Sequence, residues 1–122
     1  MKTKELLIME PHENFRTLFR TIIERQDWEV KVHEAQTREE GLSVLKKILP
    51  EIVFFDITLR SDRENLETEI KAIVPVCRVI VLIPFEEEMF ARWHKTDDIE
   101  KFLSKDKLSE RLIPTLQQYL EV

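Results

Sequence analysis

Residues 52–56 of the chain read Ile52-Val53-Phe54-Phe55-Asp56, four consecutive apolar residues followed by a carboxylate. A short run of aromatic and β-branched residues without polar alternation predicts a strand buried on both faces, as in a parallel sheet. In open sheets of this kind, ligands bind beyond the carboxyl ends of the strands. The stretch therefore predicts a central parallel strand and makes Asp56 a candidate functional residue.

The rest of the chain alternates strand-like and helix-like segments around this stretch. Strands are expected over residues 6–9, 28–33, 52–56, 79–83 and 99–103, and helices over residues 11–23, 37–49, 66–74, 85–95 and 108–120. Pro11 suits the first turn of the first helix, residues 37–40 form a capping box, and Pro114 is expected to bend the last helix or remove one of its hydrogen bonds.

This order predicts an α/β fold with a flavodoxin-like, doubly wound sheet. Five parallel strands are expected in the order 2-1-3-4-5, with five helices covering both faces. The strand over residues 28–33 alternates apolar and polar side chains, which is typical of an edge position. We expect one domain over residues 1–122, with no output domain in this chain.

Composition narrows the class of protein. The 122 residues carry a net charge of −5 and are 43% hydrophobic and 35% charged, a balance typical of a globular domain. No apolar stretch approaches the roughly 20 residues of a membrane span, and there is no signal-peptide pattern. The net negative charge argues against direct nucleic-acid contact. The single cysteine, Cys77, fits a reducing compartment, so we expect a cytoplasmic protein.

Four stretches of the chain are informative together: residues 7–16, 52–59, 79–82 and 101–106. In these stretches the chain resembles two-component response regulator receiver (CheY-like) domains. Residues 7–16 are similar to the first strand and the acidic loop after it, and residues 52–59 to the phosphoacceptor strand and its loop. Residues 79–82 resemble the fourth strand, and residues 101–106 the fifth strand with its lysine. The resemblance covers essentially the whole chain and implies a phosphorelay signalling function.

The resemblance also implies roles for individual residues. Asp56 matches the phosphoacceptor, Lys105 the lysine that pairs with the phosphoryl oxygens, and Phe102 the switch aromatic. Glu10 matches the first acid of the loop after the first strand. In the family such acids and the phosphoacceptor hold Mg²⁺, so Glu10 and Asp56 are the candidate ligands for a weak or absent Mg²⁺ site.

The chain departs from the family at three positions, and it also lacks the glycine expected later in the loop after the phosphoacceptor. Pro11 stands where a second acid is expected and has no side-chain oxygen. Ile83 stands at the switch Ser/Thr position and cannot donate a hydrogen bond to a phosphoryl group. Arg60 replaces the usual proline of the loop after the phosphoacceptor. We therefore expect impaired phosphorylation at Asp56, with a histidine kinase or phosphotransfer protein as the partner.

Three alternatives stay open from the sequence. The first is a phosphorylation-independent pseudo-receiver, a protein–protein interaction or homodimerisation module that uses the face of residues 85–95, 99–103 and 108–120, including Trp93. The second is a structural role, in which Asp56 and Lys105 form a simple salt bridge. The third, an aspartate-based phosphohydrolase, is disfavoured because Thr58 stands where those enzymes carry a second aspartate, so the chain is not expected to be an enzyme.

Overall fold

The structure is a computed structural model that describes residues 3–60, 65–84 and 96–122. One parallel sheet contains five strands in the order β2-β1-β3-β4-β5. The strands are β1 (Lys4–Met9), β2 (Val30–Ala35), β3 (Ile52–Asp56), β4 (Arg78–Ile83) and β5 (Lys101–Ser104). The predicted strand order is therefore confirmed, including the edge position of β2.

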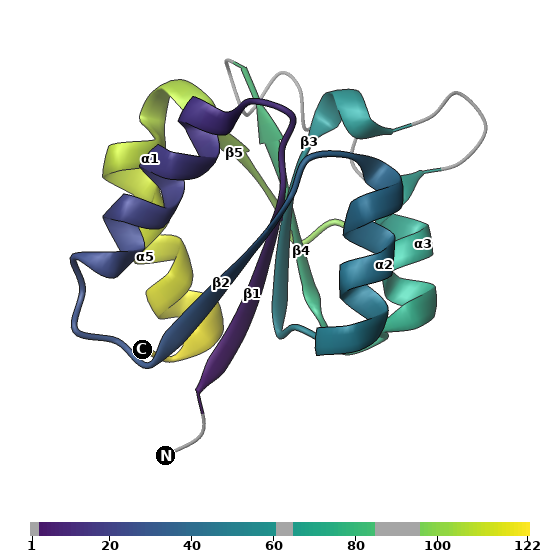
Figure 1. Ribbon diagram of the computed structural model, residues 1–122, viewed down its shortest axis with the longest axis horizontal. Helices are drawn as coiled ribbons and strands as arrows, with labels where there is room; N and C mark the ends of the chain where they lie inside the picture. Colours follow the sequence, from purple (N-terminus) through teal and green to yellow (C-terminus); the bar gives the residue numbers. More distant parts are fainter. Residues whose placement is uncertain (1–2, 61–64, 85–95) are drawn as a thin grey trace.

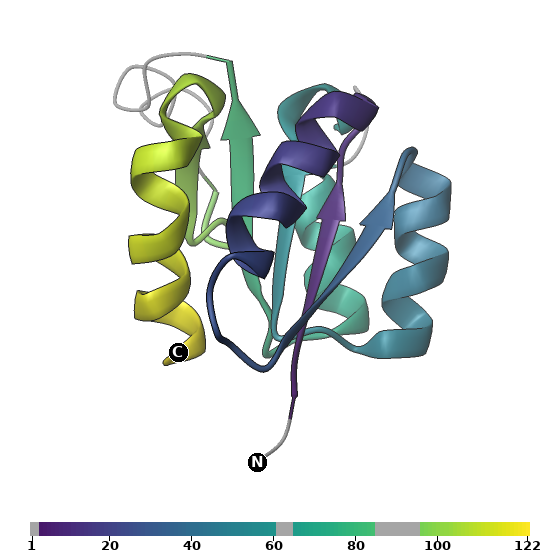
Figure 2. The same ribbon diagram turned by 60° about the vertical axis from the view of Figure 1, so that its left-hand side comes forward.

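Helices cover both faces of this sheet. The α-helices of the described residues are α1 (Glu13–Glu24), α2 (Arg38–Ile48), α3 (Leu66–Ile73) and α5 (Leu108–Leu120), with short 3₁₀ turns η1 (Ile57–Leu59) and η2 (Lys105–Lys107). In Figure 1, α1 and α5 lie on one side of the sheet and α2 and α3 on the other, and Figure 2 shows the same layers after rotation. The helix expected over residues 85–95, with Trp93, lies outside the described residues. None of the described helices is long and apolar enough to cross a bilayer.

Two hydrophobic clusters hold these layers together. Strand β3 contributes to both, because Val53 and Phe55 face one cluster while Ile52 and Phe54 face the other. Phe19 of α1 packs edge-on against Phe54, with the ring centroids 4.9 Å apart. Every residue of β3 is buried, which confirms the two-sided burial predicted from its unbroken apolar sequence.

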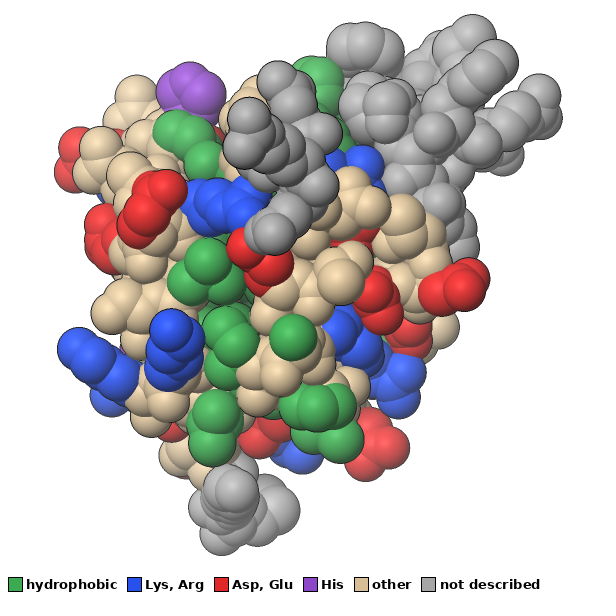
Figure 3. All heavy atoms as spheres, turned by 90° about the vertical axis from the view of Figure 1, so that its right-hand side faces the viewer, with side chains coloured by type: hydrophobic (Ala, Val, Ile, Leu, Met, Phe, Trp, Pro, Cys, Tyr) green, Lys and Arg blue, Asp and Glu red, His purple; other side chains and the backbone are tan. Residues whose placement is uncertain are grey.

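The outer side of α2 and α3 is mixed in character. Figure 3 looks onto this side of the molecule and shows hydrophobic side chains among Lys, Arg, Asp and Glu side chains. Leu49, which follows α2, and Val76, which lies between α3 and β4, are among the exposed large hydrophobic residues. Scattered exposure of this kind is normal for a protein surface.

Helix α2 shows how local sequence positions an element on the sheet. The Thr37 hydroxyl accepts a hydrogen bond from the Glu40 backbone N–H at 3.1 Å, which confirms the Thr37 half of the predicted capping box. Gly41 lies directly over Met9, since a Cβ atom at position 41 would come within 2.2 Å of the Met9 side chain. Leu49 then ends the helix in the left-handed region with φ of 49°. The chain's only glycine is therefore used for close helix–sheet packing, and the helix ends without one.

Three predicted details were wrong. The second strand runs over Val30–Ala35 rather than residues 28–33, because its register with β1 pairs Val30 with Lys4 and Ala35 with Met9. Pro11 does not lie in the first turn of α1, because that helix starts at Glu13 with His12 as its N-cap. The Glu10 carboxylate accepts the His12 backbone N–H and keeps that residue extended, which delays the helix. The fifth strand starts at Lys101 rather than Ile99, because the Ile99 N–H bonds to the Thr96 carbonyl in a turn.

The strands are parallel, so all of them begin at one end of the sheet and finish at the other; the end where they finish is the carboxyl edge. The start of β1 and the end of α5 both lie where the strands begin, as Figures 1 and 2 show. At the opposite edge the register pairs Met9 with Phe55, Asp56 with Leu82 and Ile83 with Ser104. The last residues of β1, β3, β4 and β5 therefore meet at one edge, and the residues after them form the candidate site.

Candidate functional site

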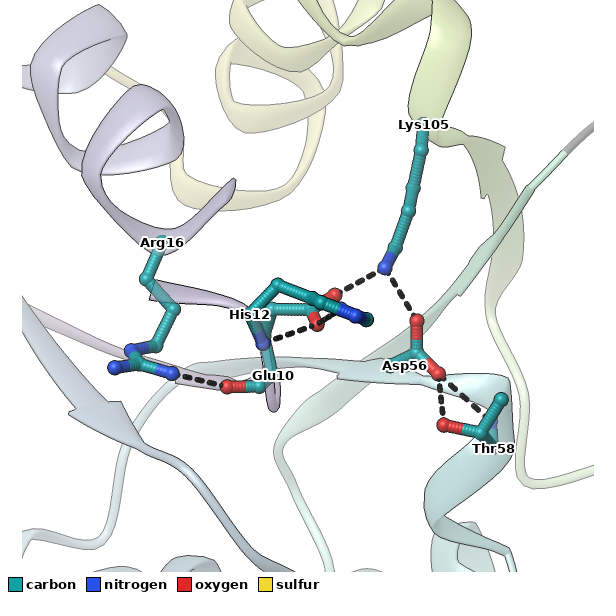
Figure 4. A network of polar contacts seen from close by, with 6 residues as sticks. All are labelled: Glu10, His12, Arg16, Asp56, Thr58 and Lys105. Carbon is teal, nitrogen blue, oxygen red and sulfur yellow. Dashed lines mark hydrogen bonds and ion pairs between the residues drawn. The ribbon is translucent and has the colours of Figure 1, made fainter. Parts of the chain in front are cut away.

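Three charged side chains converge at the carboxyl edge of the sheet. Glu10 directly follows β1 and is fully buried, Asp56 ends β3 and is buried, and Lys105 opens η2 after β5. The Lys105 ammonium lies 2.5 Å from Asp56 Oδ2 and also forms an ion pair with Glu10 Oε1 (Figure 4). The structure thus brings together the three site residues predicted from separate parts of the sequence.

Asp56 is held in its ionised form. Its Oδ1 atom accepts a hydrogen bond from the Thr58 backbone N–H at 2.8 Å and another from the Thr58 hydroxyl. Burial alone would raise the pKa of Asp56, but the hydrogen bonds from Lys105 and Thr58 outweigh it and keep that pKa below its ordinary value. Asp56 is therefore a carboxylate at neutral pH, with both oxygens engaged by neighbours.

Lys105 is the cation shared by the two acids. Burial would lower the pKa of its ammonium, but hydrogen bonds to Asp56 and Glu10 raise it above its ordinary value. The ammonium also lies 4.7 Å from the centre of the Phe15 ring, an attractive cation–π arrangement. Lys105 is therefore positively charged and held on three sides.

Glu10 is fixed by the loop that leads into α1. Its Oε2 atom accepts the His12 backbone N–H at 3.0 Å and lies 3.1 Å from His12 Nδ1. Arg16 of α1 donates to the Glu10 carbonyl at 2.6 Å, which anchors the backbone (Figure 4). One carboxylate oxygen of Glu10 is therefore used by the loop, and the other faces Lys105.

Glu10 and Asp56 are the two carboxylates that would hold Mg²⁺, and in this structure both are paired with Lys105. That ion prefers an octahedral shell of oxygen ligands, usually one or two carboxylates with water. Here the Lys105 ammonium already bridges the two carboxylates, and Pro11 adds no side-chain oxygen. Within residues 3–60, 65–84 and 96–122, no group of three or more His, Cys, Asp or Glu side chains is placed to hold a metal ion.

The two predicted switch positions belong to the core. Ile83, the last residue of β4, and Phe102 of β5 are both buried in the cluster that faces α2 and α3. Ile83 is paired in register with Ser104, but the Ser104 hydroxyl donates to the Asp106 carboxylate. The side chain at position 83 therefore offers the site only an apolar surface.

Four residues that contribute to the site were not predicted as site residues from the sequence. Thr58 and His12 bond to the two carboxylates, Phe15 stacks on the lysine, and Arg16 anchors the loop. The spacing Asp56-x-Thr58 is a signal that could have been used, because aspartate commonly accepts a hydrogen bond from the backbone two residues later. Phe15 gives no such signal, since its position on one face of α1 predicts only a core role.

Comparisons with known proteins place the chain by fold. No protein-family model matches the sequence, and no curated protein matches it either. Among solved structures, the RcsB response regulator of Salmonella typhimurium is similar with a TM-score of 0.82 and 21% identity, covering 99% of this chain and 61% of that chain.

Two further solved structures are similar to the chain. The response regulator domain of Thermotoga maritima CheB matches with a TM-score of 0.76 and 18% identity, over 99% of this chain and 98% of that chain. A Burkholderia pseudomallei response regulator with a phosphorylated aspartic acid and a calcium ion matches with a TM-score of 0.74 and 20% identity, over 93% of this chain and 66% of that chain. The chain therefore has the fold of response regulator receiver domains.

Proposed function

We propose that this chain is a receiver domain of a two-component phosphorelay system, with impaired phosphorylation at Asp56. The observation that carries the proposal is the convergence of Glu10, Asp56 and Lys105 at the carboxyl edge of a receiver-type sheet. A structurally similar response regulator holds a phosphorylated aspartic acid. The proposed partner is a histidine kinase or phosphotransfer protein, and the proposed location is the cytoplasm.

The chemistry proposed for Asp56 is attack on a phosphoryl group carried by the partner's histidine. A carboxylate oxygen forms a bond to phosphorus as the bond between phosphorus and the histidine nitrogen breaks, and the histidine keeps that electron pair. An ionised Asp56 supplies the nucleophile. The Lys105 ammonium, which lies beside Oδ2, is placed to pair with the phosphoryl oxygens.

Two features of the site support impairment. Pro11 supplies no acid, and Ile83 supplies no hydroxyl. A hydrogen bond to a charged group contributes about 1.5–3 kcal/mol, so the missing hydroxyl alone corresponds to about 10- to 100-fold slower transfer if it acts in the transition state.

The test is to incubate the purified chain with acetyl phosphate, with and without Mg²⁺, and to measure its intact mass. Little or no adduct of about 80 Da is expected for the wild type, and none for Asp56→Asn. The double variant Pro11→Asp, Ile83→Thr restores an acid and a hydroxyl, so it should gain an Asp56-dependent adduct. Strong wild-type labelling that needs Asp56 would refute the impairment, and a folded double variant that stays unlabelled would count against the receiver chemistry.

A phosphorylation-independent pseudo-receiver is the second candidate. It is favoured by the same ion cluster, because Glu10, Lys105 and Asp56 satisfy one another without a phosphoryl group. In this role the chain acts as an interaction or homodimerisation module that uses a face including β5 and α5. Sedimentation of the wild type and of Asp56→Asn should then give the same dimer, and a monomer at every concentration would exclude the homodimer.

A further inference from the structure

A second buried acid lies outside the candidate site. Glu67, in the first turn of α3, has no solvent-exposed surface. Arg60 binds it in a two-pronged manner, with Nε 3.1 Å from Oε1 and an Nη atom 2.5 Å from Oε2. The Thr96 hydroxyl donates to the same Oε2 at 2.8 Å. A buried carboxylate needs such partners, because its charge is costly to bury alone.

The first partner, Arg60, is connected to Asp56 by a single turn. Asp56 is the N-cap of η1, and its Oδ1 accepts the Thr58 N–H. Arg60 is the C-cap of the same turn, and its N–H bonds to the Ile57 carbonyl at 3.2 Å. A change in the hydrogen bonding of Asp56 therefore alters the turn that positions the Arg60 guanidinium.

The other partner belongs to the segment that leads into β5. Thr96 precedes that strand, and the neighbouring Asp98 accepts a second hydrogen bond from α3, donated by the Thr68 hydroxyl at 3.1 Å. The segment continues through the buried Ile99 into β5. Two adjacent residues of α3, Glu67 and Thr68, thus hold the residues before β5.

We propose that Glu67 couples the loop after Asp56 to the segment before β5. Displacement of Arg60 moves the buried Glu67 carboxylate. The hydrogen bonds of the Thr96 and Thr68 hydroxyls then transmit that movement to residues 96–98. This route passes through α3 and makes no use of Ile83 of β4, which has only an apolar side chain. The coupling is a property of the fold and does not depend on phosphorylation of Asp56.

The experiment measures the response of the segment before β5 to a change at Asp56. Amide chemical shifts of Asp98 and Ile99 are compared with and without Asp56→Ala, which removes the cap of η1. The comparison is made in the wild type and in one double variant, which carries both Thr68→Val and Thr96→Val. That double variant removes the two hydroxyl hydrogen bonds between α3 and residues 96–98 and leaves the Arg60–Glu67 pair. Thr115→Val is the control for the loss of a buried hydroxyl near β5: that hydroxyl donates within α5 and accepts a hydrogen bond from Lys101 of β5 at 3.4 Å, on the face of the sheet opposite α3.

The response at Asp98 and Ile99 should be present in the wild type and in Thr115→Val and lost in the double variant. Asp56→Ala also frees Lys105, which could perturb β5 from its other end. A response of equal size in the double variant would show that the signal travels by Lys105, and it would overturn the proposal. If the double variant does not fold, Glu67→Gln is used instead, because it weakens the bonds of residue 67 to both Arg60 and Thr96. An undiminished response in Glu67→Gln would also contradict the proposal.

Discussion

Replacing Lys105 by methionine tests the electrostatics of the site directly. The substitution keeps most of the side-chain volume and removes the cation shared by Glu10 and Asp56. Two buried carboxylates then face each other without a counter-charge. Removing one partner of a buried ion pair costs about 3–5 kcal/mol. Because the Lys105 side chain is 19% exposed, we expect a loss of about 2–4 kcal/mol in unfolding free energy at about pH 8.

The variant should recover stability as the pH falls. Repulsion and burial raise the pKa of one carboxylate in the folded variant, so between its unfolded and folded pKa values the folded state binds one more proton than the unfolded state. Stability then increases by up to about 1.4 kcal/mol for each unit of decreasing pH in that window. In the wild type, by contrast, the pKa of Asp56 is lowered, so its contribution is complete above the unfolded pKa and is lost as the pH falls through the folded pKa.

The assay is urea unfolding followed by circular dichroism at several pH values from about 5 to about 8. Lys107→Met is the control, because Lys107 is exposed and lies two residues away on the same turn. The difference in unfolding free energy between Lys105→Met and the wild type should become smaller toward acid pH. The difference between Lys107→Met and the wild type should stay small and constant. A Lys105→Met deficit that is absent, or equal at all pH values, would refute the shared-cation account of the site.

Three further predictions concern the fold. Gly41→Ala should destabilise the protein by about 1–2 kcal/mol in urea unfolding, because overpacking against the buried Met9 outweighs the better helix propensity of alanine; unchanged or increased stability would contradict this packing. Thr37→Ala should cost about 1 kcal/mol by removing the acceptor for the Glu40 N–H, whereas Thr37→Ser should cost little, and equal losses would argue against a capping role. Burial raises the pKa of the Cys77 thiol to about 11, so it should react with an aromatic disulfide reagent at about pH 8 only after urea is added, and fast reaction of the folded protein would show that the thiol is accessible.

The sheet was predictable because its strands differ in hydrophobic pattern. The unbroken apolar sequences of β3 and β4 predicted central positions, and the alternation in β2 predicted an edge. The ends of elements were less predictable, since they depend on contacts between distant residues. The extended backbone at His12, for example, follows from its bond to the Glu10 carboxylate, which no propensity scale contains.

The candidate site, too, could be predicted only in part: its main residues could be named from the sequence, but their contacts could not. Asp56 could be named because it ends a predicted buried strand, and ligands gather at such strand ends, whereas Glu10 and Lys105 were named from the resemblance to receiver domains. The sequence did not predict that Lys105 contacts both acids at once, because that depends on side-chain conformation. Nor did it predict the burial of Glu67, whose position in α3 reads as an ordinary acid in a first helical turn.

The positions of the first strand and the last helix have a practical consequence for experiments. The start of β1 and the end of α5 both lie at the end of the sheet where the strands begin, opposite the edge that carries Asp56 (Figure 1). A biotin tag or a fused fluorescent protein attached before β1 or after α5 would therefore lie at the end of the sheet opposite the site. The protein can be immobilised in two ways with the Asp56 edge facing solution, and a genuine partner of that edge should bind equally well to both surfaces.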